Sequence, residues 1–309
     1  MKQNRRGNAR LSLLMALRLA APHTWAASLI PALLGAALTA GMGVRVDTGM
    51  LLCLTAACVF MQAAANTFND YSDYIKGTDT LENSPEAYDA VLVYDKPSTR
   101  SVLLLGFLYL LCAAAFGLPA ILRAGWRPLM IGFAGAAVVL LYSFGKTPLS
   151  YLPLGELCSG FVMGGLIPLA VTGVLSGSFR FSVLLDALPV MLGVSLIMLT
   201  NNGCDIKRDS EAGRRTFAVL LGQEKTAALY RGLLLLWAAL PIPLLLWRQG
   251  SGALAYLIAF LPAYGHFSAQ LRLKLGAEGR ASGMAGIAAL NTMLGLAYIV
   301  SLLFRLNLI

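Results

Sequence analysis

The chain has 309 residues, of which 58% are hydrophobic and only 13% are charged, and its mean hydropathy is +0.71. Soluble domains carry roughly 25% charged residues, so this composition excludes a soluble globular domain and predicts an integral membrane protein. The net charge of +9 lies mainly in short segments between apolar runs, which argues against nucleic-acid binding.

The N-terminal segment, residues 1–22, combines a basic start with a short apolar stretch from Leu11 to Leu17. A signal peptide has a similar start, but Arg18 ends the apolar stretch and Pro22 precedes a full-length apolar run. We therefore expect an amphipathic helix at the membrane interface instead of a cleaved signal.

Nine apolar runs follow, and each has the length that an α-helix needs to cross a bilayer. The alternating pattern of a membrane strand is absent, and a helix satisfies its own backbone groups in lipid. The sequence predicts an all-α bundle of nine transmembrane helices that forms one domain over residues 1–309. The runs lie near 25–43, 48–68, 101–122, 127–145, 155–176, 181–200, 226–247, 252–271 and 283–305.

The basic residues predict the orientation of this bundle. With nine spans, 18 of the 24 Lys and Arg residues fall on the side of the N-terminus. Because cytoplasmic loops are enriched in basic residues, we expect the N-terminus in the cytoplasm. Thirteen of the 15 carboxylates fall on the same side, although this rule does not sort acidic residues. The charged chemistry is therefore expected on the cytoplasmic face.

A first acidic motif opens the polar stretch 69–100, which we interpret as a cytoplasmic active-site loop. It reads Asn69-Asp70-Tyr-Ser-Asp73-Tyr-Ile-Lys76-Gly77-Thr-Asp79 and follows Asn66. Asn69 and Asp73 are four residues apart, which places both side chains on one face of a helix.

A short loop between the fourth and fifth runs contains Tyr142 and Lys146, and it leads to Glu156. Tyr142 is a candidate to line a substrate cavity, through contact of its ring with a cation or an aromatic substrate. Lys146 is a candidate anion ligand. An interfacial tyrosine and a topology-determining lysine would be the plainer explanations.

A second acidic motif opens the polar stretch 201–225, the other expected active-site loop. It reads Asn201-Asn202-Gly-Cys-Asp205-Ile-Lys207-Arg208-Asp209-Ser-Glu211-Ala-Gly213-Arg214-Arg215-Thr216. Asp205 and Asp209 again share one helix face. Solvated charges at a helix end would explain either motif alone, but two such faces at equivalent ends of two spans indicate a joint site.

Carboxylate and amide oxygens suit Mg²⁺, which shares its coordination sphere with waters and phosphates. Two such faces could hold Mg²⁺ around one diphosphate, and basic neighbours would complete the anion site. The metal-ligand candidates are Asn69, Asp70, Asp73, Asp79, Asp205 and Asp209; the substrate-binding candidates are Asn66, Asn202, Lys207, Arg214 and Arg215; and the catalytic candidates are Asp73, Asp205, Asp209, Tyr142 and Lys146.

Together these residues resemble the UbiA superfamily of intramembrane aromatic prenyltransferases. The first match is Asn69-Asp70-x-x-Asp73, continuing into Lys76-Gly77-x-Asp79, and the second is Asp205-x-x-x-Asp209, continuing into Glu211-Ala-Gly213-Arg214-Arg215-Thr216. The 142–156 loop and the nine-span pattern extend the resemblance over most of the chain.

Within the superfamily, the spacing is most similar to that of 1,4-dihydroxy-2-naphthoate polyprenyltransferases of menaquinone synthesis. Ubiquinone-branch enzymes usually place a third aspartate four residues after the position of Asp73, where this chain has Gly77 and brings its acid at Asp79. The paired Asn201-Asn202 points the same way. The stretch 82–100 departs from the pattern, because it lacks the arginine-rich continuation of the commonest members.

The resemblance implies Mg²⁺-dependent transfer of a polyprenyl group from polyprenyl diphosphate to 1,4-dihydroxy-2-naphthoate, with loss of CO₂ and diphosphate, in the cell membrane. The aspartates and Asn69 would hold Mg²⁺, and Lys146, Arg214 and Arg215 would bind the diphosphate. Another aromatic acceptor, such as 4-hydroxybenzoate, is the alternative.

Three other classes of protein compete with this interpretation. Transporters usually carry their acids near the bilayer midplane, whereas these lie at the ends of spans. CDP-alcohol phosphotransferases need a compact Asp-Gly-x-x-Ala-Arg type motif, which the sequence lacks. Soluble isoprenyl synthases share the diphosphate chemistry but not this composition.

Overall fold

The computed structural model describes residues 9–81, 88–249 and 251–304, and these ranges contain helices and no β-strand. The prediction of an all-α protein is confirmed. Parts of three predicted segments lie outside the described residues, namely 1–8 of the N-terminal segment, 82–87 of the stretch 69–100, and residue 305 of the last run.

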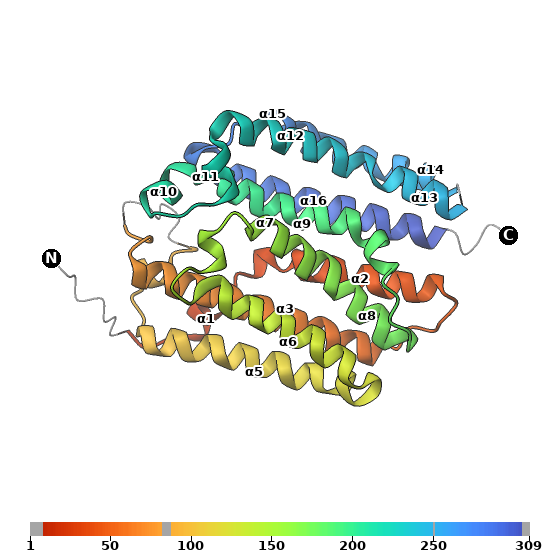
Figure 1. Ribbon diagram of the computed structural model, residues 1–309, viewed down its shortest axis with the longest axis horizontal. Coiled ribbons are helices and arrows are strands. Elements are labelled where there is room, and N and C mark those ends of the chain that lie inside the picture. The colour runs from red at the N-terminus through yellow and green to blue at the C-terminus, as the bar shows by residue number, and fades with distance from the viewer. Residues whose placement is uncertain (1–8, 82–87, 250, 305–309) are drawn as a thin grey trace.

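Long helices lie side by side along the longest axis of the molecule (Figure 1). The elements in chain order are α1 (Leu13–Leu19), η1 (Pro22–Thr24), α2 (Ala26–Gly41), α3 (Thr48–Lys76), α4 (Val91–Tyr94), α5 (Thr99–Ala124), α6 (Trp126–Ser143), η2 (Leu149–Tyr151), α7 (Gly155–Ser159), the π-helix η3 (Gly160–Leu166), α8 (Ile167–Ser176), α9 (Val183–Cys204), α10 (Ile206–Glu211), α11 (Phe217–Leu221), α12 (Gln223–Ala239), α13 (Pro241–Gln249), α14 (Ser251–Phe260), η4 (Leu261–Ala263), α15 (Tyr264–Arg272), η5 (Ala277–Gly279) and α16 (Arg280–Leu303).

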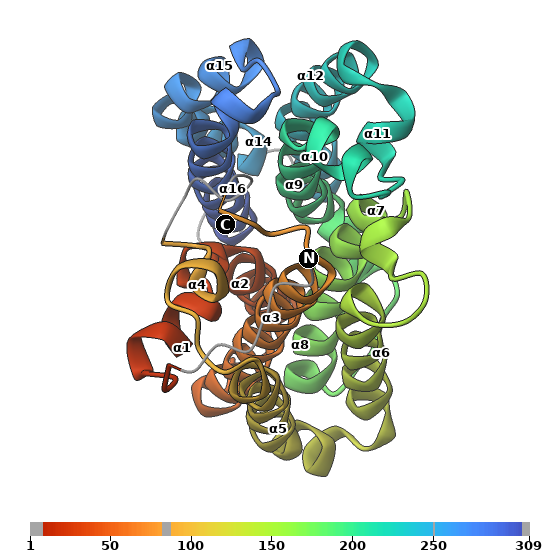
Figure 2. The ribbon, with the colours of Figure 1, turned by 90° about the vertical axis from the view of Figure 1, so that its left-hand side faces the viewer.

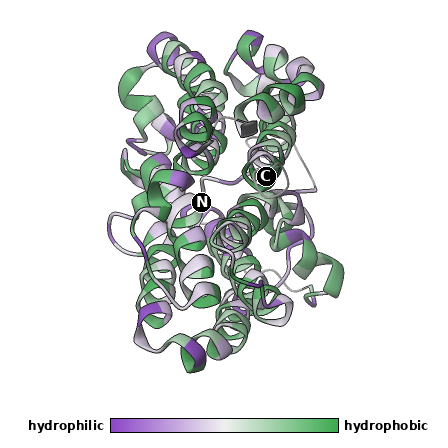
Figure 3. Cartoon of the chain, turned by 90° about the vertical axis from the view of Figure 1, so that its right-hand side faces the viewer, coloured by the Kyte–Doolittle hydropathy of each residue, from purple (hydrophilic) through white to green (hydrophobic). Residues whose placement is uncertain are grey.

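Among the described residues, seven helices are long and apolar enough to cross a membrane, or eight if one bent pair forms a single span. Apolar residues predominate over most of the helical surface (Figure 3). The seven are Thr48–Lys76, Thr99–Ala124, Trp126–Ser143, Gly155–Ser176, Val183–Cys204, Gln223–Arg248 and Ala277–Leu303. The chain is therefore an integral membrane protein.

The count of nine spans is not confirmed, and the differences have local causes. The first run belongs to a bent pair, in which Leu13–Thr24 and Ala26–Gly41 meet at 56°. The run 252–271 is divided by η4, whose Pro262 lacks the N–H that a continuous helix would use. The run 252–271 was expected to be one span, and the run 25–43 was expected to follow an interfacial helix; the bend lies at the junction of that helix and the run.

The two polar stretches are more helical than the expected loops. Helix α3 continues through the first motif to Lys76, and α9 continues to Cys204, after which α10 covers the centre of the second motif. Both stretches lie at the same end of the bundle, at the left of Figure 1, and Figure 2 looks onto this end.

The end of α3 folds back on itself at the first motif. Gly77 adopts the left-handed conformation, with φ of 83°, that a glycine accepts without strain. The backbone oxygen of Asp73 accepts hydrogen bonds from the N–H groups of Gly77, Thr78 and Asp79, at 3.0, 2.9 and 3.3 Å. This turn brings the backbone of Asp79 back to that of Asp73.

Small residues let the π-helix η3 approach α9 closely. A side-chain carbon added to Gly164 would lie 2.4 Å from Cα of Met191, and one added to Gly160 would lie 2.8 Å from the Met191 backbone oxygen. Any side chain larger than that of glycine at these two positions would collide with α9. This contact fixes α9, the helix that ends in the second motif.

Candidate active site

Arg214 joins the two acidic motifs. Its guanidinium donates from Nη2 to Oδ1 of Asp73, which is 141 residues away in the chain, and from Nη1 to Oδ1 of Asp209 at 3.4 Å. All three residues are buried. A turn at Gly213, with φ of 74°, and a 2.8 Å hydrogen bond from the Arg214 N–H to the Asp209 backbone oxygen place this side chain. The expected meeting of the two motifs at one site is thus present in the structure.

Asp205 lies in a second cluster of ion pairs. Its Oδ2 accepts from Arg208 Nη2 at 2.8 Å and from Arg280 Nε at 3.2 Å, and Arg280 also donates to Asn201 Oδ1 at 3.0 Å. Sequence reasoning treated Arg280 only as a basic residue that sets orientation. It lies 75 residues from Asp205, at the start of the last helix, and no local pattern marks it.

The acids of the first motif are close enough to repel one another. The negative charges of Asp73 and Asp79 both repel that of Asp70. Asn69 donates a hydrogen bond to Oδ2 of Asp73 at 3.3 Å. Burial raises the pKa of the Asp79 carboxyl to about 6, and the charge of Asp73 acts in the same direction. Such a group of neighbouring acids, with Asp73 buried and Asp70 and Asp79 half-buried, favours a bound cation.

Charge is balanced differently around the second motif. Burial raises the pKa of Asp209 to about 6, although Arg214 opposes this effect. Burial disfavours the charged form of Arg214, but its ion pairs with Asp73 and Asp209 outweigh this, and the pKa of its guanidinium lies above the ordinary value. Arg214 therefore stays positively charged at every physiological pH.

The carboxylate and amide oxygens of the two motifs are suitable ligands for a hard divalent cation, but their present positions do not form a metal site. Within the described residues, no three His, Cys, Asp or Glu side chains converge closely enough to hold a metal ion as they stand. Arginines pair with Asp73, Asp205 and Asp209. A cation at these carboxylates would have to exchange with the guanidinium groups.

Two buried donors at the site lack acceptors. Nε of Arg208 and Nε of Arg214 are buried and have no hydrogen-bond partner in the described part of the chain. An unsatisfied buried donor is unfavourable, and in native proteins it often marks a missing ligand. An anion with several acceptor oxygens, such as a diphosphate, would satisfy both arginines.

Tyr151 is a functional candidate that sequence reasoning missed. Its ring centre lies 4.8 Å from Nζ of Lys76 and 5.3 Å from the guanidinium carbon of Arg214. Lys76 also donates to the Ser143 backbone oxygen at 3.1 Å, and the Arg215 N–H donates to the Tyr151 backbone oxygen at 2.9 Å. The 142–156 loop thereby holds one cation from each motif against one aromatic ring.

Tyr142 lies beside this cluster, and its role in lining a substrate cavity stays a prediction. It is the penultimate residue of α6, its hydroxyl donates to Sδ of Met198 at 3.4 Å, and the charges of Arg214, Asp73 and Asp209 act on it. Lys146, Lys207 and Arg215 have exposed side chains that form no ion pair within the described residues. Their roles in anion binding stay predictions.

The two amide side chains expected to bind substrate have other contacts in the structure. Asn66, which is on α3, donates to the Ala20 backbone oxygen at 3.2 Å and to Thr24 Oγ1 at 3.1 Å. It therefore ties α3 to the bend that precedes α2. Asn202 donates to Oε1 of Glu156 at 2.9 Å. Neither amide touches the Arg214 cluster, and their contact with substrate stays a prediction.

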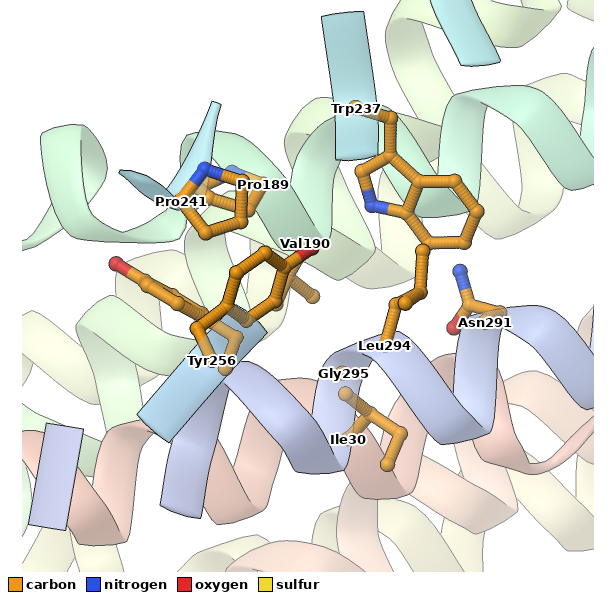
Figure 4. Close-up of a pocket in the computed structure, with 10 residues that line it drawn as sticks. Ile30, Pro189, Val190, Trp237, Pro241, Tyr256, Asn291, Leu294 and Gly295 are labelled. Carbon is orange, nitrogen blue, oxygen red and sulfur yellow. The ribbon is translucent and has the colours of Figure 1, made fainter. Parts of the chain in front are cut away.

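A separate pocket lies deeper in the bundle, between α2, α9, α12, α14 and α16 (Figure 4). It is mainly apolar, with Trp237 and Tyr256 among its lining residues, and it contains no residue of the acidic motifs. Asn291 lines this pocket and is 2% exposed, so it points into the bundle. Its Oδ1 has no partner among the described residues.

Comparison with known sequences identifies the family. The profile of the UbiA prenyltransferase family matches residues 28–303. The chain belongs to the UbiA prenyltransferase family. The resemblance noted in the sequence is confirmed, and the protein is a prenyltransferase by family.

Curated UbiA relatives are about a third identical to this chain over the aligned residues. It is 33% identical to the 1,4-dihydroxy-2-naphthoate octaprenyltransferase of Bacillus subtilis (strain 168) over 212 residues, which cover 69% of this chain and 67% of that protein. It is 32% identical to the human UbiA prenyltransferase domain-containing protein 1 over 229 residues, which cover 73% of this chain and 65% of that protein. The match thus spans about two thirds of each relative.

Solved UbiA structures share the fold of this protein. A UbiA homolog from Archaeoglobus fulgidus, bound to DMAPP and Mg²⁺, superposes with a TM-score of 0.58 at 16% identity and covers 92% of this chain and 99% of that one. The structure of a digeranylgeranylglyceryl phosphate synthase gives a TM-score of 0.59 at 19% identity, covering 94% and 98%.

Proposed function

We propose that this protein transfers a polyprenyl group from polyprenyl diphosphate to 1,4-dihydroxy-2-naphthoate, with loss of CO₂ and diphosphate, giving demethylmenaquinol, the hydroquinone form of demethylmenaquinone. The observation that carries the proposal is the bridge that Arg214 forms between Asp73 and Asp209. The Nε of Arg214 is buried and has no acceptor among the described residues. The similarity to the Bacillus subtilis enzyme supports the choice of acceptor.

Mg²⁺ is the proposed cofactor. Asn69, Asp70, Asp73, Asp79, Asp205 and Asp209 would hold it, and the Mg²⁺ bound to the Archaeoglobus fulgidus homolog supports this assignment. When bound, the metal neutralises charge on the diphosphate. The repulsion among Asp70, Asp73 and Asp79 favours a cation at the same place.

The residues of this chain act on the diphosphate as it leaves. Arg214 and Arg208 donate from Nε to its oxygens, and Lys76 adds a charge beside Tyr151. Because these cations are positioned before the reaction, they stabilise the charge that develops on the leaving group. Lys146, Lys207 and Arg215 would attract the anion from the exposed rim.

Bond changes follow from this stabilisation. The bond between the allylic carbon and the diphosphate oxygen breaks, and the diphosphate keeps the electron pair. The electron-rich ring carbon that carries the carboxylate forms the new carbon–carbon bond, and the carboxylate leaves as CO₂, which restores the aromatic ring. Tyr142 would pack against the acceptor at the edge of the cluster.

We further propose that the chain forms one domain with nine crossings in the cell membrane and a cytoplasmic active site. The distribution of 18 of 24 basic residues on one side supports this orientation. The divided segment 252–271 would then cross as α14, η4 and α15 together. The prenyl tail would lie along the bundle and face lipid, since its exposure to water is strongly unfavourable.

The test is incubation of the purified protein with 1,4-dihydroxy-2-naphthoate, a polyprenyl diphosphate and Mg²⁺, with mass-spectrometric detection of the prenylated, decarboxylated product. Absence of product, or full activity in both Asp73→Ala and Asp205→Ala, would refute the mechanism. The same assay with 4-hydroxybenzoate decides between acceptor classes. Movement of substrate across liposomes without product would favour a transporter.

A further inference from the structure

Glu156 is a buried carboxylate that the diphosphate chemistry does not use. It is 8% exposed, and its Oε1 accepts a hydrogen bond of 2.9 Å from Asn202, which is 7% exposed. Within the described residues, no Lys, Arg or His forms an ion pair with it, and its Oε2 has no hydrogen bond. A buried acid without a cation is unfavourable unless a ligand completes its hydrogen bonds.

The position of Glu156 links it to the active site. A side-chain carbon added to the neighbouring Gly155 would lie 3.8 Å from Asn202 Nδ2 and 3.9 Å from the hydroxyl of Tyr142. Tyr142 is subject to the charges of Arg214, Asp73 and Glu156 together. Glu156 therefore lies on the same side of the bundle as the acidic cluster, with Tyr142 adjoining both.

The backbone of Glu156 is held rigidly. Its carbonyl oxygen accepts from Ser195 Oγ on α9 at 2.9 Å and from Ser159 Oγ at 3.1 Å. The π-helix η3 begins four residues later, and its glycines pack directly on α9. A carboxylate with a fixed backbone and one free oxygen is suited to accepting a hydrogen bond with defined direction.

We propose that Glu156, with Asn202 and Tyr142, forms the subsite for a ring hydroxyl of the aromatic acceptor. The hydroxyl donates to Oε2 of Glu156, while Asn202 fixes Oε1 and the Tyr142 ring packs on the acceptor. A hydrogen bond to a carboxylate is stronger than one to a neutral group, and it moves electron density into the ring that forms the new bond. This assignment rests on the proposed function, because it presumes an aromatic acceptor.

Kinetics of Glu156→Gln test the subsite, because this substitution keeps the shape and removes the charge. We expect KM for the dihydroxynaphthoate to rise by about tenfold or more, as loss of a charged hydrogen bond does, with KM for the prenyl diphosphate unchanged. Glu224→Gln, at an exposed acid of α12, is the matched control and leaves both constants unchanged. Equal effects on both substrates, or no effect on acceptor KM, would overturn the proposal.

Inhibition of the wild-type enzyme gives a second test, which does not depend on whether a substituted protein folds. We expect 1-hydroxy-2-naphthoate to compete with the acceptor at least about tenfold more strongly than 2-naphthoate, which lacks the hydroxyl. Equal inhibition by the two compounds would overturn the subsite while product formation still supports the prenyltransferase. Absence of product from any aromatic acceptor would instead refute the proposed function.

Discussion

The ring of Tyr151 lies 5.3 Å from the guanidinium carbon of Arg214, so an aromatic face supports the cation that joins both acidic motifs. The same ring faces Lys76. We expect Tyr151→Leu to lower kcat/KM for the prenyl diphosphate by about threefold to thirtyfold, since each cation–π contact contributes about 0.5–1 kcal/mol or more. Tyr151→Phe keeps the ring and should stay close to wild type. Tyr264→Leu, at an exposed tyrosine, is the control.

Removal of Arg214 should affect stability as well as activity. Arg214→Ala leaves Asp73 and Asp209 buried without their shared cation, and loss of one partner from a buried ion pair costs about 3–5 kcal/mol. We expect a lower unfolding temperature in detergent, partly restored by Mg²⁺. Arg231→Lys, at an exposed arginine of α12, should leave the unfolding temperature unchanged. A stable Arg214→Ala protein with full activity would contradict the bridge.

Arg280 should matter although it lies far from both motifs in sequence. Arg280→Gln removes the contacts with Asp205 and Asn201. We expect kcat/KM for the prenyl diphosphate to fall by about tenfold, since hydrogen bonds to charged groups contribute about 1.5–3 kcal/mol. Arg272→Gln, at an exposed position of α15, provides a comparison at the same end of the bundle. Equal activity of the two variants would remove Arg280 from the site.

The stability of the metal-free protein should fall as pH rises from about 4 to above 6. The pKa values of Asp79 and Asp209 are raised from 3.8 to about 6, so the folded protein holds these protons more tightly than the unfolded chain does. Stability is therefore fully present below the ordinary value and is lost as pH rises through the folded value, by on the order of 2 kcal/mol for each carboxyl group.

Thermal unfolding with EDTA at pH 5 and pH 7.5 measures this dependence. Mg²⁺ should restore stability at the higher pH, because it neutralises the ionised carboxylates. Asp79→Asn cannot ionise and should reduce the difference between the two pH values. An unchanged difference in this variant would exclude Asp79 as a source.

The approach of η3 to α9 can be tested with two glycines. Gly164→Ala places a carbon 2.4 Å from Cα of Met191 and should destabilise the protein by about 1–3 kcal/mol. Gly132→Ala on α6 meets no atom within 4 Å and should be neutral or slightly stabilising. Equal unfolding temperatures of the two variants would show that the helices adjust easily.

The sequence predicted what depends on local spacing and composition. Four-residue steps placed Asn69 with Asp73 on one helix, and the basic residues placed both motifs at one end of the bundle. The partners of the acids were harder to predict, because Arg214 meets Asp73 across 141 residues and Arg280 meets Asp205 across 75. Nothing in a single sequence marks such pairs.

Asn66 shows a second limit of sequence reasoning. Its place before the first motif suggested contact with substrate, which stays a prediction; the structure adds that this amide donates to the Ala20 backbone oxygen and to Thr24 Oγ1, at the bend before α2. A bend of this kind depends on packing between segments, which the spacing of residues along the chain does not show. Tyr151 escaped notice for a similar reason, since an aromatic residue in a short loop has many ordinary uses.

The turn that ends α3 has a mechanical consequence. Three successive N–H groups hold the backbone oxygen of Asp73, and its carboxylate is held by Arg214. The connection from α3 toward α5 therefore starts at a residue, Asp73, that is bound to Arg214, and Arg214 joins the two acidic motifs. A shift of the end of α3 would break the three backbone hydrogen bonds and the ion pair of Asp73 with Arg214 together, so these contacts hold the two acidic motifs at a fixed separation.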